Sequence, residues 1–347
     1  MTHFDPDAAA APGSGVFGLP FSAEEAKVIL LPVPFEATTS YGGGAAEGCA
    51  AIREASAQVD LFDAEIGRPY EPGIAMLDED DAIRAWNDEA KADAAPVIEA
   101  GGAGDDPLLL GMLARVNDRC ERVNDWVYER TRALLAAGKI PCVVGGDHAV
   151  PFGAIRAYAE KFPGMGILHL DAHADLRDAY EGFAWSHASI FHNVMERIPG
   201  VAKLVQVGIR DLGRAEYDYA KNSGGRVVTH FDQVLCDERF AGATWGAQVE
   251  RIVAGLPQQV YLSFDIDGLD PTLCPHTGTP VPGGLSFQQA CALVAGVARS
   301  GRTIVGLDLC EVAPGAEGDQ WDGNVGARLL YKMIGWMLRS QGLIQAP

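Results

Sequence analysis

Short apolar runs alternate along the chain with longer stretches in which apolar positions recur about every three to four residues. The runs that we expect to form strands cover residues 28–35, 140–146, 165–173, 203–209, 226–231, 259–267 and 303–312. The clearest amphipathic stretches, which predict helices, cover residues 114–138, 286–300 and 321–340. Strands that are apolar throughout and separated by helices are typical of a parallel sheet covered on both faces. The pattern therefore predicts an α/β fold with a mostly parallel central sheet.

The regular alternation gives no sign of a second domain, so we expect one domain over residues 28–347. Residues 1–27 are small and interrupted by Pro and Gly, which predicts a flexible N-terminal arm. Residues 85–112 are acidic and rich in Gly and Ala, and we expect them to form a loop excursion. The chain has no GxGxxG or P-loop, and Gly42–Gly44 lack the lysine and the spacing of a phosphate cradle.

Composition and charge narrow the class of protein. Of the 347 residues, 48% are hydrophobic and 21% are charged, which is typical of a globular protein. The net charge of −20 disfavours a nucleic-acid partner and favours cations, although a solvated acidic surface explains it equally well. Seven cysteines without a CxxC pair predict a reducing, cytoplasmic location. No signal peptide and no apolar run of membrane-spanning length is present, so we expect no membrane partner.

Polar residues gather where three of the predicted strands end. The three clusters are GGDH with Asp147 and His148, DAHAD with Asp171, His173 and Asp175, and FDIDGLDP with Asp265, Asp267 and Asp270. In an open α/β sheet, ligands bind in the crevice beyond the carboxyl ends of the strands. Alternate residues of an extended segment point to one side, so the DxHxD residues should face the same way, as should Asp265 and Asp267.

These clusters predict a binuclear metal site. The candidate ligands are His148, Asp171, His173, Asp175, Asp265 and Asp267. Carboxylates that converge on one cleft repel one another, and two divalent cations would balance the charge of four of them. Oxygen and imidazole ligands without thiolate suit Mn²⁺ or Ni²⁺, so we expect two such ions as cofactors. Two ions roughly 3.5–4 Å apart can activate a water molecule near neutral pH.

Each motif also has a structural explanation when it is taken alone. DxHxD and DxD sequences are common in tight turns, and Asp147 could cap the helix that follows GGDH. The joint presence of three clusters at three strand ends is what favours the metal site.

In combination, these motifs resemble the ureohydrolases, the family of arginase, agmatinase and guanidinobutyrase. The resemblance runs from about residue 28 to residue 340. It rests on GGDH (145–148), DAHAD (171–175), SFDIDGLDP (263–271), TGTPVPGG (277–284) and GLDLCEV (306–312). The resemblance implies a three-layer α/β/α, arginase-like fold, a trimer or hexamer, and two manganese ions.

The resemblance also implies how the ligands are shared. His148, Asp171, Asp175 and Asp265 would serve one ion or bridge the pair. His173 and Asp267 would complete the other ion, with Asp171 and Asp265 as the bridges.

Further residues receive roles from the same resemblance. Glu311 matches the family carboxylate that pairs with the substrate guanidinium, a group that stays protonated at ordinary pH. His187 matches the histidine that passes protons to the leaving amine, and we place both with Asp175 among the catalytic residues. Ser263 and Asp147 are expected to orient ligands. A helix cap at Glu311 and a surface position of His187 are the alternatives.

Four more residues are candidate substrate contacts. Thr279 belongs to the TGTP loop that shapes the cleft, and His276 replaces the glycine that is common before this loop. Trp185 could offer an aromatic face to a delocalised cation, and Asp211 could meet a cationic part of the substrate. Packing for Trp185, solvent for His276 and an Arg210 salt bridge for Asp211 are the alternatives.

Two departures bear on the substrate. Arginases place Asn and Ser after DxHxD to hold the amino-acid carboxylate, but the loop LRDAYEGFAWSHAS has no Asn, so we do not expect arginine. Agmatinases usually read SHGT where this chain has Ser186–Ser189 as SHAS. These departures resemble the divergent agmatinase-like branch that includes guanidine and biguanide hydrolases.

The expected function is hydrolysis of a C–N bond in a small cationic guanidino compound, with release of urea or a urea-like product and an amine. Agmatine, guanidine, a guanidino acid and metformin are the candidate substrates. The alternatives are hydrolysis of a formimino or amide group, and a metal-binding, noncatalytic subunit of a hetero-oligomer. We expect a homo-oligomer, or an oligomer that includes a paralogous subunit.

Overall fold

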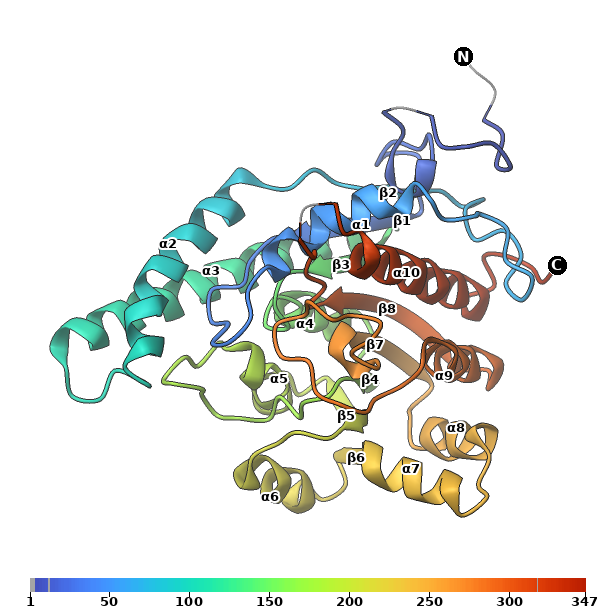
Figure 1. Cartoon of the computed structure of the whole chain (residues 1–347). Coiled ribbons are helices and arrows are strands. Elements are labelled where there is room, and N and C mark those ends of the chain that lie inside the picture. Colours follow the sequence, from blue (N-terminus) through green and yellow to red (C-terminus); the bar gives the residue numbers. More distant parts are fainter. Residues whose placement is uncertain (1–3, 12, 317) are drawn as a thin grey trace.

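The computed structural model describes residues 4–11, 13–316 and 318–347. Its centre is one eight-stranded sheet in the order β2-β1-β3-β8-β7-β4-β5-β6, in which every neighbouring pair is parallel (Figure 1). The strands are β1 (Val28–Val33), β2 (Ile74–Met76), β3 (Ile140–Gly145), β4 (Met165–Leu170), β5 (Val201–Ile209), β6 (Val227–Phe231), β7 (Gln259–Asp265) and β8 (Thr303–Cys310). The predicted α/β fold with a parallel central sheet is confirmed, and only the three-residue β2 was missed.

Helices connect the strands and cover the sheet. The α-helices of the described residues are α1 (Gly48–Ser56), α2 (Asp81–Glu99), α3 (Pro107–Ala136), α4 (Phe152–Lys161), α5 (Ile190–Arg197), α6 (Arg214–Asn222), α7 (Asp232–Phe240), α8 (Trp245–Ala254), α9 (Phe287–Arg299) and α10 (Trp321–Ser340). None of them is long and apolar enough to cross a lipid bilayer.

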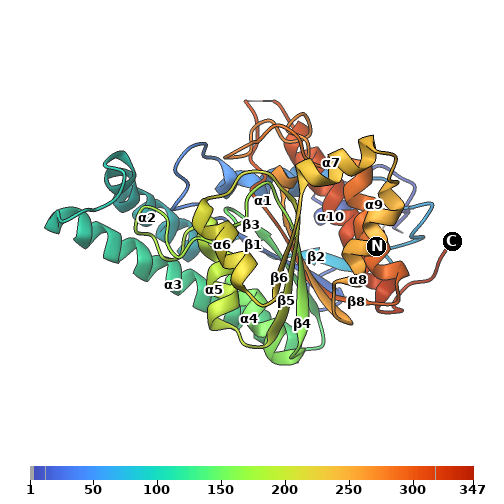
Figure 2. The same cartoon turned by 90° about the horizontal axis from the view of Figure 1, so that it is seen from below.

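The helices form two layers, one on each face of the sheet. Figure 2 shows α2 to α6 on one side and α7 to α10 on the other, and α1 packs against α10. Strands β1, β3 and β4 are buried along their whole length, and β7 and β8 are buried from their second residue onward. This burial on both faces explains why their sequences are apolar throughout rather than alternating.

The expected loop excursion at residues 85–112 is wrong, because most of this segment is helical. It contains the larger part of α2 and the start of α3, which pack against each other and project from one end of the molecule (Figure 1). Asp80 and Asp106 cap the two helices by accepting hydrogen bonds from Ala82 N and Leu108 N. Alanine, glutamate and lysine favour helix, and only the glycine-rich residues 100–106 form the turn between the helices.

Part of the expected flexible arm is also ordered. Val16, Phe17 and Leu19 are buried, and the Phe17 ring lies 4.9 Å from the ring of Tyr331 on α10. The backbone N–H of Phe17 donates to Ser56 Oγ at the end of α1. These residues are therefore part of the hydrophobic core, although the sequence before them contains many Ala, Pro and Gly.

The sheet order places the three polar clusters together. Strands β3, β8, β7 and β4 are consecutive neighbours, and because they are parallel their carboxyl ends lie at one edge of the sheet. The GGDH and FDIDGLDP segments begin in the last residues of β3 and β7, and DAHAD and Glu311 directly follow β4 and β8. Segments separated by more than a hundred residues in sequence thus meet at one site.

Candidate active site

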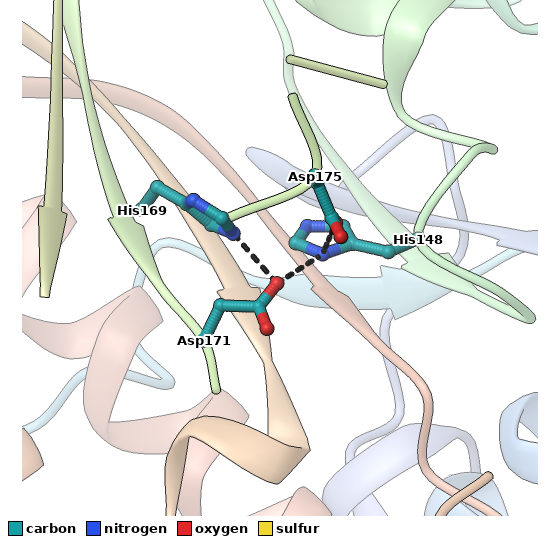
Figure 3. A group of neighbouring side chains, drawn as sticks. All are labelled: His148, His169, Asp171 and Asp175. Atoms are coloured by element: carbon teal, nitrogen blue, oxygen red, sulfur yellow. Dashed lines mark hydrogen bonds and ion pairs between the residues drawn. The ribbon is translucent and has the colours of Figure 1, made fainter. Parts of the chain in front are cut away.

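Three carboxylates surround one imidazole nitrogen at this edge of the sheet. His148 Nδ1 lies 3.1 Å from Asp171 Oδ2, 3.4 Å from Asp175 Oδ2 and 3.3 Å from Asp265 Oδ2. Figure 3 shows His148, Asp171 and Asp175 pointing toward one another. All four side chains are 5% exposed or less. We call His148, Asp171, Asp175 and Asp265 the inner group.

The hydrogen bonds on the far side of His148 fix which ring nitrogen carries the hydrogen of the neutral imidazole. His148 Nε2 lies 2.9 Å from Ser263 Oγ, and the Ser263 hydroxyl donates to Asp308 Oδ1. Burial raises the pKa of Asp308 to about 6, so this carboxyl is an ionised acceptor at neutral pH. Since the Ser263 hydrogen is used, Ser263 must accept from His148 Nε2–H. Nδ1 is therefore the nitrogen that faces the three carboxylates, and it can carry a proton there or offer its lone pair to a cation.

A second pair of ligands lies beside the inner group. His173 Nδ1 is 3.0 Å from Asp267 Oδ2 and 3.5 Å from Asp171 Oδ1. The His173 side chain is 24% exposed, whereas Asp267 is 1% exposed. We call His173 and Asp267 the outer group. Asp171 directs one carboxylate oxygen to each group, so it is the side chain that joins them.

The backbone explains how residues that follow two different strands meet here. Asp175 lies with Asp171 at His148, although its backbone has a left-handed φ of 54° instead of an extended conformation. Asp267 lies in a 3₁₀ turn (Ile266–Gly268), and its N–H donates to Asp265 Oδ1. A Cβ on Gly268 would lie 2.7 Å from Asp171 N, so only glycine allows the two segments to approach this closely.

The electrostatics of the inner group favour added positive charge. Burial and the charge of Asp171 raise the pKa of Asp175 to about 8, and burial with the charge of Asp267 raises the pKa of Asp265 well above its ordinary value. Burial alone would lower the pKa of His148, but the three carboxylates raise it well above its ordinary value. The metal-free group therefore retains protons, and divalent cations would take their place.

Burial would also lower the pKa of His173, but Asp267 and Asp171 raise it to about 12. The carboxylates beside His173 thus also stabilise an added positive charge in the outer group. The donor set is imidazole nitrogen and carboxylate oxygen in both groups, which fits two divalent transition-metal ions.

His169 was not among the residues that we expected in the site. It lies on β4, is fully buried, and its Nε2 is 2.7 Å from Asp171 Oδ2 (Figure 3). The signal in the sequence was its position two residues before Asp171, because alternate residues of a strand share one face.

A cavity of about 170 Å³ opens next to the two groups. Five of the residues predicted for the site contribute to its wall: His173, Asp175, His187, Asp211 and Thr279. The wall also contains residues that we did not single out: Ser40, Arg177, Tyr180, Ala188, Leu212 and Glu216. The side chain of Arg177 lies over the ring of Tyr180 at 5.0 Å, and its Nε is 3.5 Å from Glu216 Oε2.

His187 begins a short 3₁₀ turn (His187–Ser189) and lines the cavity. Its Nδ1 lies 3.3 Å from Thr38 Oγ1 and 3.4 Å from Ser186 Oγ. Burial, followed by the nearby positive charge of His173, lowers the pKa of His187 to about 4. The ring is therefore neutral at pH 7.

Glu311 follows β8 and has a left-handed φ of 62°. Its Oε1 accepts a hydrogen bond from His148 N at 2.9 Å, and its backbone N–H donates to Gly146 O. Burial and the charge of Asp147 raise the pKa of Glu311 well above its ordinary value. No described residue hydrogen-bonds Oε2, and a Cβ on Gly278 would lie 3.6 Å from it. This oxygen is thus the one available to a ligand.

Three predicted substrate contacts lie outside the cavity wall: Glu311, which is buried beside the inner group, His276 and Trp185. His276 is exposed, and its Nδ1 lies 2.9 Å from Asp322 Oδ2 in the first turn of α10. Trp185 packs against the ring of Phe152 at 4.9 Å, and the Arg197 side chain covers it at 4.8 Å. The structure does not bring His276 or Trp185 to the inner or outer group.

Comparisons with known proteins cover most of the chain. Residues 26–335 match the sequence model of the arginase family. An N(1)-aminopropylagmatine ureohydrolase from Thermus thermophilus is 34% identical over 314 residues, covering 90% of this chain and 90% of that protein. An agmatinase from Bacillus cereus is 30% identical over 317 residues, covering 91% and 94%. A proclavaminate amidino hydrolase from Streptomyces clavuligerus has the same fold, with a TM-score of 0.70, 25% identity and coverage of 96% and 99%.

Proposed function

The chain belongs to the arginase family, and we propose that it hydrolyses a C–N bond of a small cationic guanidino compound to release urea and an amine. The observation that carries this proposal is the position of Asp171, which joins two groups of metal-type ligands beside a cavity. The named relatives are ureohydrolases, which supports the reaction class.

We propose Mn²⁺ or Ni²⁺ as the two ions, held by the inner and outer groups with Asp171 between them. When bound, two such ions supply a water molecule that is activated for attack near neutral pH. The donors are nitrogen and oxygen atoms of His148, the three inner carboxylates, His173 and Asp267. The thiol of Cys310 lies near His148 beside Asp308, but burial raises its pKa well above the ordinary value, so it stays protonated. This donor set supports Mn²⁺ or Ni²⁺ over a structural zinc.

The guanidinium of the substrate requires an anion in the pocket, because it stays protonated at ordinary pH. We assign this role to Glu311. Its Oε1 is fixed by the backbone of His148, and among the described residues no hydrogen bond occupies its Oε2. A charge-assisted hydrogen bond from the guanidinium would keep Glu311 ionised and would orient the carbon that is attacked.

The leaving amine must gain a proton, and we assign its transfer to His187. Thr38 and Ser186 lie next to Nδ1, so Nε2 is the nitrogen that we assign to proton exchange. A neutral imidazole can accept a proton from the attacking water and deliver it to the nitrogen that departs.

The charges at the wall support a substrate with a cationic tail. Apart from the proposed metal ligands His173 and Asp175, the wall carries two negative charges from Asp211 and Glu216 and one positive charge from Arg177, which leaves one net negative charge. Arg177 is already paired with Glu216, so Asp211 is the side chain that we propose for a tail amine. Agmatine fits this pattern better than arginine or a guanidino acid, whose carboxylates would face Asp211.

A urea-release assay tests the proposed function. The purified chain is reconstituted separately with Mn²⁺ and with Ni²⁺ and is offered agmatine, N(1)-aminopropylagmatine, guanidine, guanidinobutyrate, arginine, metformin and, as the alternative substrate class, a formimino compound. Urea from a guanidino compound with a cationic tail is the expected result. Formamide from a formimino compound, without urea from any of these, would contradict the proposal. Activity only after addition of a paralogous chain would identify a hetero-oligomer.

We further propose that the chain acts in a reducing, cytoplasmic compartment as a homo-oligomer, a trimer or a hexamer. Its seven cysteines are all free, and only Cys236 is partly exposed. Size-exclusion chromatography with light scattering tests the oligomeric state.

A further inference from the structure

Behind the inner group, a line of buried polar side chains crosses three neighbouring strands. Thr229 on β6 donates its hydroxyl to Gln206 Oε1 on β5 at 3.0 Å. Gln206 Nε2 lies 3.1 Å from His169 Nδ1 on β4, and His169 Nε2 lies 2.7 Å from Asp171 Oδ2. Gln206, His169 and Asp171 are all fully buried. Polar groups in such a place are costly unless they are hydrogen-bonded, and these are.

The orientation of the Gln206 amide is fixed by a second contact. Gln206 Nε2 also donates to the backbone carbonyl of Ala174 at 2.7 Å. If the amide were turned, two oxygens would face each other at that distance, so the nitrogen must be the atom that lies there. The same NH₂ group therefore directs its other hydrogen to His169 Nδ1.

The protonation of His169 follows from this orientation. Since Nδ1 accepts from Gln206, the ring hydrogen of the neutral imidazole is on Nε2 and points to Asp171 Oδ2. Nε2 has no lone pair to offer to an ion. Phe191, whose ring centroid is 4.0 Å from that of His169, restricts rotation of the ring. His169 lies within reach of the inner group but has the wrong tautomer for a ligand.

We propose that Gln206 and His169 are positioning residues that hold the carboxylates of the metal site, and that His169 is not itself a ligand. The inference rests on the metal pair of the proposed function. Through His169, Gln206 fixes Asp171, the side chain that joins the inner and outer groups. Through the Ala174 carbonyl, Gln206 fixes the backbone directly before Asp175, where the left-handed φ of 54° requires support. One amide thus orients two ligands of the inner group.

Metal affinity and stoichiometry test this proposal without reference to activity. Wild type, His169→Leu, His169→Gln and Gln206→Met are titrated with Mn²⁺ against a fluorescent chelator, and bound metal is counted at saturation. Loss of a group that orients ligands typically weakens metal binding by about 10–100-fold. We expect this loss in His169→Leu and in Gln206→Met, with two ions still bound at saturation. His169→Gln keeps an N–H donor of similar reach and should recover part of the affinity.

Two matched controls separate this effect from general damage to the core. Gln248→Met makes the same change at a buried glutamine that bonds Leu235 O and Glu238, away from the site. His230→Leu makes the same change as His169→Leu on β6. Both controls should bind Mn²⁺ as wild type does. The melting temperature of each metal-free variant shows whether it folds. If His169→Leu does not fold, the comparison of Gln206→Met with Gln248→Met provides the test.

Three results would overturn the inference or its basis. Wild-type affinity in both His169→Leu and Gln206→Met contradicts a positioning role. A His169→Leu chain that binds one ion at saturation identifies His169 as a ligand. A wild-type chain that binds no divalent ion contradicts the proposed function itself, and the inference with it.

Discussion

The inner and outer groups contain the same types of side chain but differ in their surroundings. The inner group is buried, and two of its members are hydrogen-bonded from behind: His148 donates to Ser263 Oγ, and Asp171 accepts from His169. In the outer group, His173 is 24% exposed and lies on the cavity wall. The inner side chains are thus held in place before any ion arrives, whereas His173 can adjust to an ion or a substrate.

This difference suggests that the two groups hold their ions with different affinities and exchange rates. A buried, fixed set of carboxylates binds an ion tightly but exchanges it slowly, because the ligands cannot move aside. An exposed imidazole permits exchange and contact with the substrate. We therefore expect the inner ion to be retained and the outer ion to be the first one lost on dialysis.

The largest effect is expected at the side chain that the two groups share. Asp171→Asn should lose both ions and lower turnover by at least about 10³-fold, because an amide does not balance the charge of either ion. Metal analysis and urea release measure this loss. Asp270→Asn is the matched control, since the Asp270 carboxylate accepts hydrogen bonds from Thr272 N and Oγ1 and belongs to neither group. Retention of both ions by Asp171→Asn would show that the groups are not joined through this residue.

The next test compares the two histidines. His148→Ala should lose the inner ion and destabilise the metal-free chain, because three buried carboxylates lose their partner at a cost of about 3–5 kcal/mol. His173→Ala should lose the outer ion with a smaller change in stability, because solvent reaches that position. Metal content and thermal melting compare the variants. Equal destabilisation by both would remove the distinction between the groups.

A substitution of Glu311 tests whether a side chain beside the inner group binds the substrate. Glu311→Gln keeps an acceptor for His148 N but removes the charge that we assign to the guanidinium. Both ions should remain. The transition-state stabilisation measured by kcat/KM should fall by about 2–5 kcal/mol, the usual cost of breaking a buried charge pair. Steady-state kinetics with metal analysis provides the measurement. Full turnover in this variant would refute the pairing.

Acidification should release metal, and the direction follows from the pKa values. Asp175, with a pKa raised to about 8, must lose a proton before it can bind an ion. Below about pH 8, protons therefore compete with metal, and the apparent affinity should fall by about tenfold per pH unit for each proton displaced. Metal titrations at pH 6, 7 and 8 measure this slope. An affinity that does not change with pH would mean that the carboxylates are already ionised.

The smallest effect is expected at the outer edge of the cavity. Asp211→Asn should raise KM for agmatine several-fold while kcat stays nearly constant, because the tail contact is made equally in the ground state and the transition state. The ratio of agmatine to guanidine turnover should fall accordingly. An unchanged ratio would remove Asp211 from the substrate-binding residues.

Much of the fold, and the clustering of the candidate metal ligands, could be predicted from the sequence. Apolar strands without alternation indicated a sheet covered on both faces, and DxHxD after a strand indicated ligands at its carboxyl end. The prediction failed where composition was the only guide. The Ala-rich residues 85–112 were taken for a loop, although alanine is the strongest helix former and aspartates were present to cap both helices.

Other features of the site depend on tertiary contacts that no local pattern reveals. Residues on one face of β4 could be paired by alternation, but the glutamine that orients His169 lies on β5 and is not marked by any motif. His276 and Trp185 have suitable chemistry for a substrate, yet their nearest partners are Asp322, Phe152 and Arg197. Burial and strand order determine whether a residue reaches the site, and neither can be deduced from the residue type.

The position of β8 in the sheet has a consequence for how the protein acquires its ions. This strand is the last of the eight in sequence, yet it lies between β3, which leads to His148, and β7, which leads to Asp265. A nascent chain that has not yet released β8 from the ribosome lacks the element that brings these ligands side by side. We therefore expect the proposed metal site to form only once the sheet is complete.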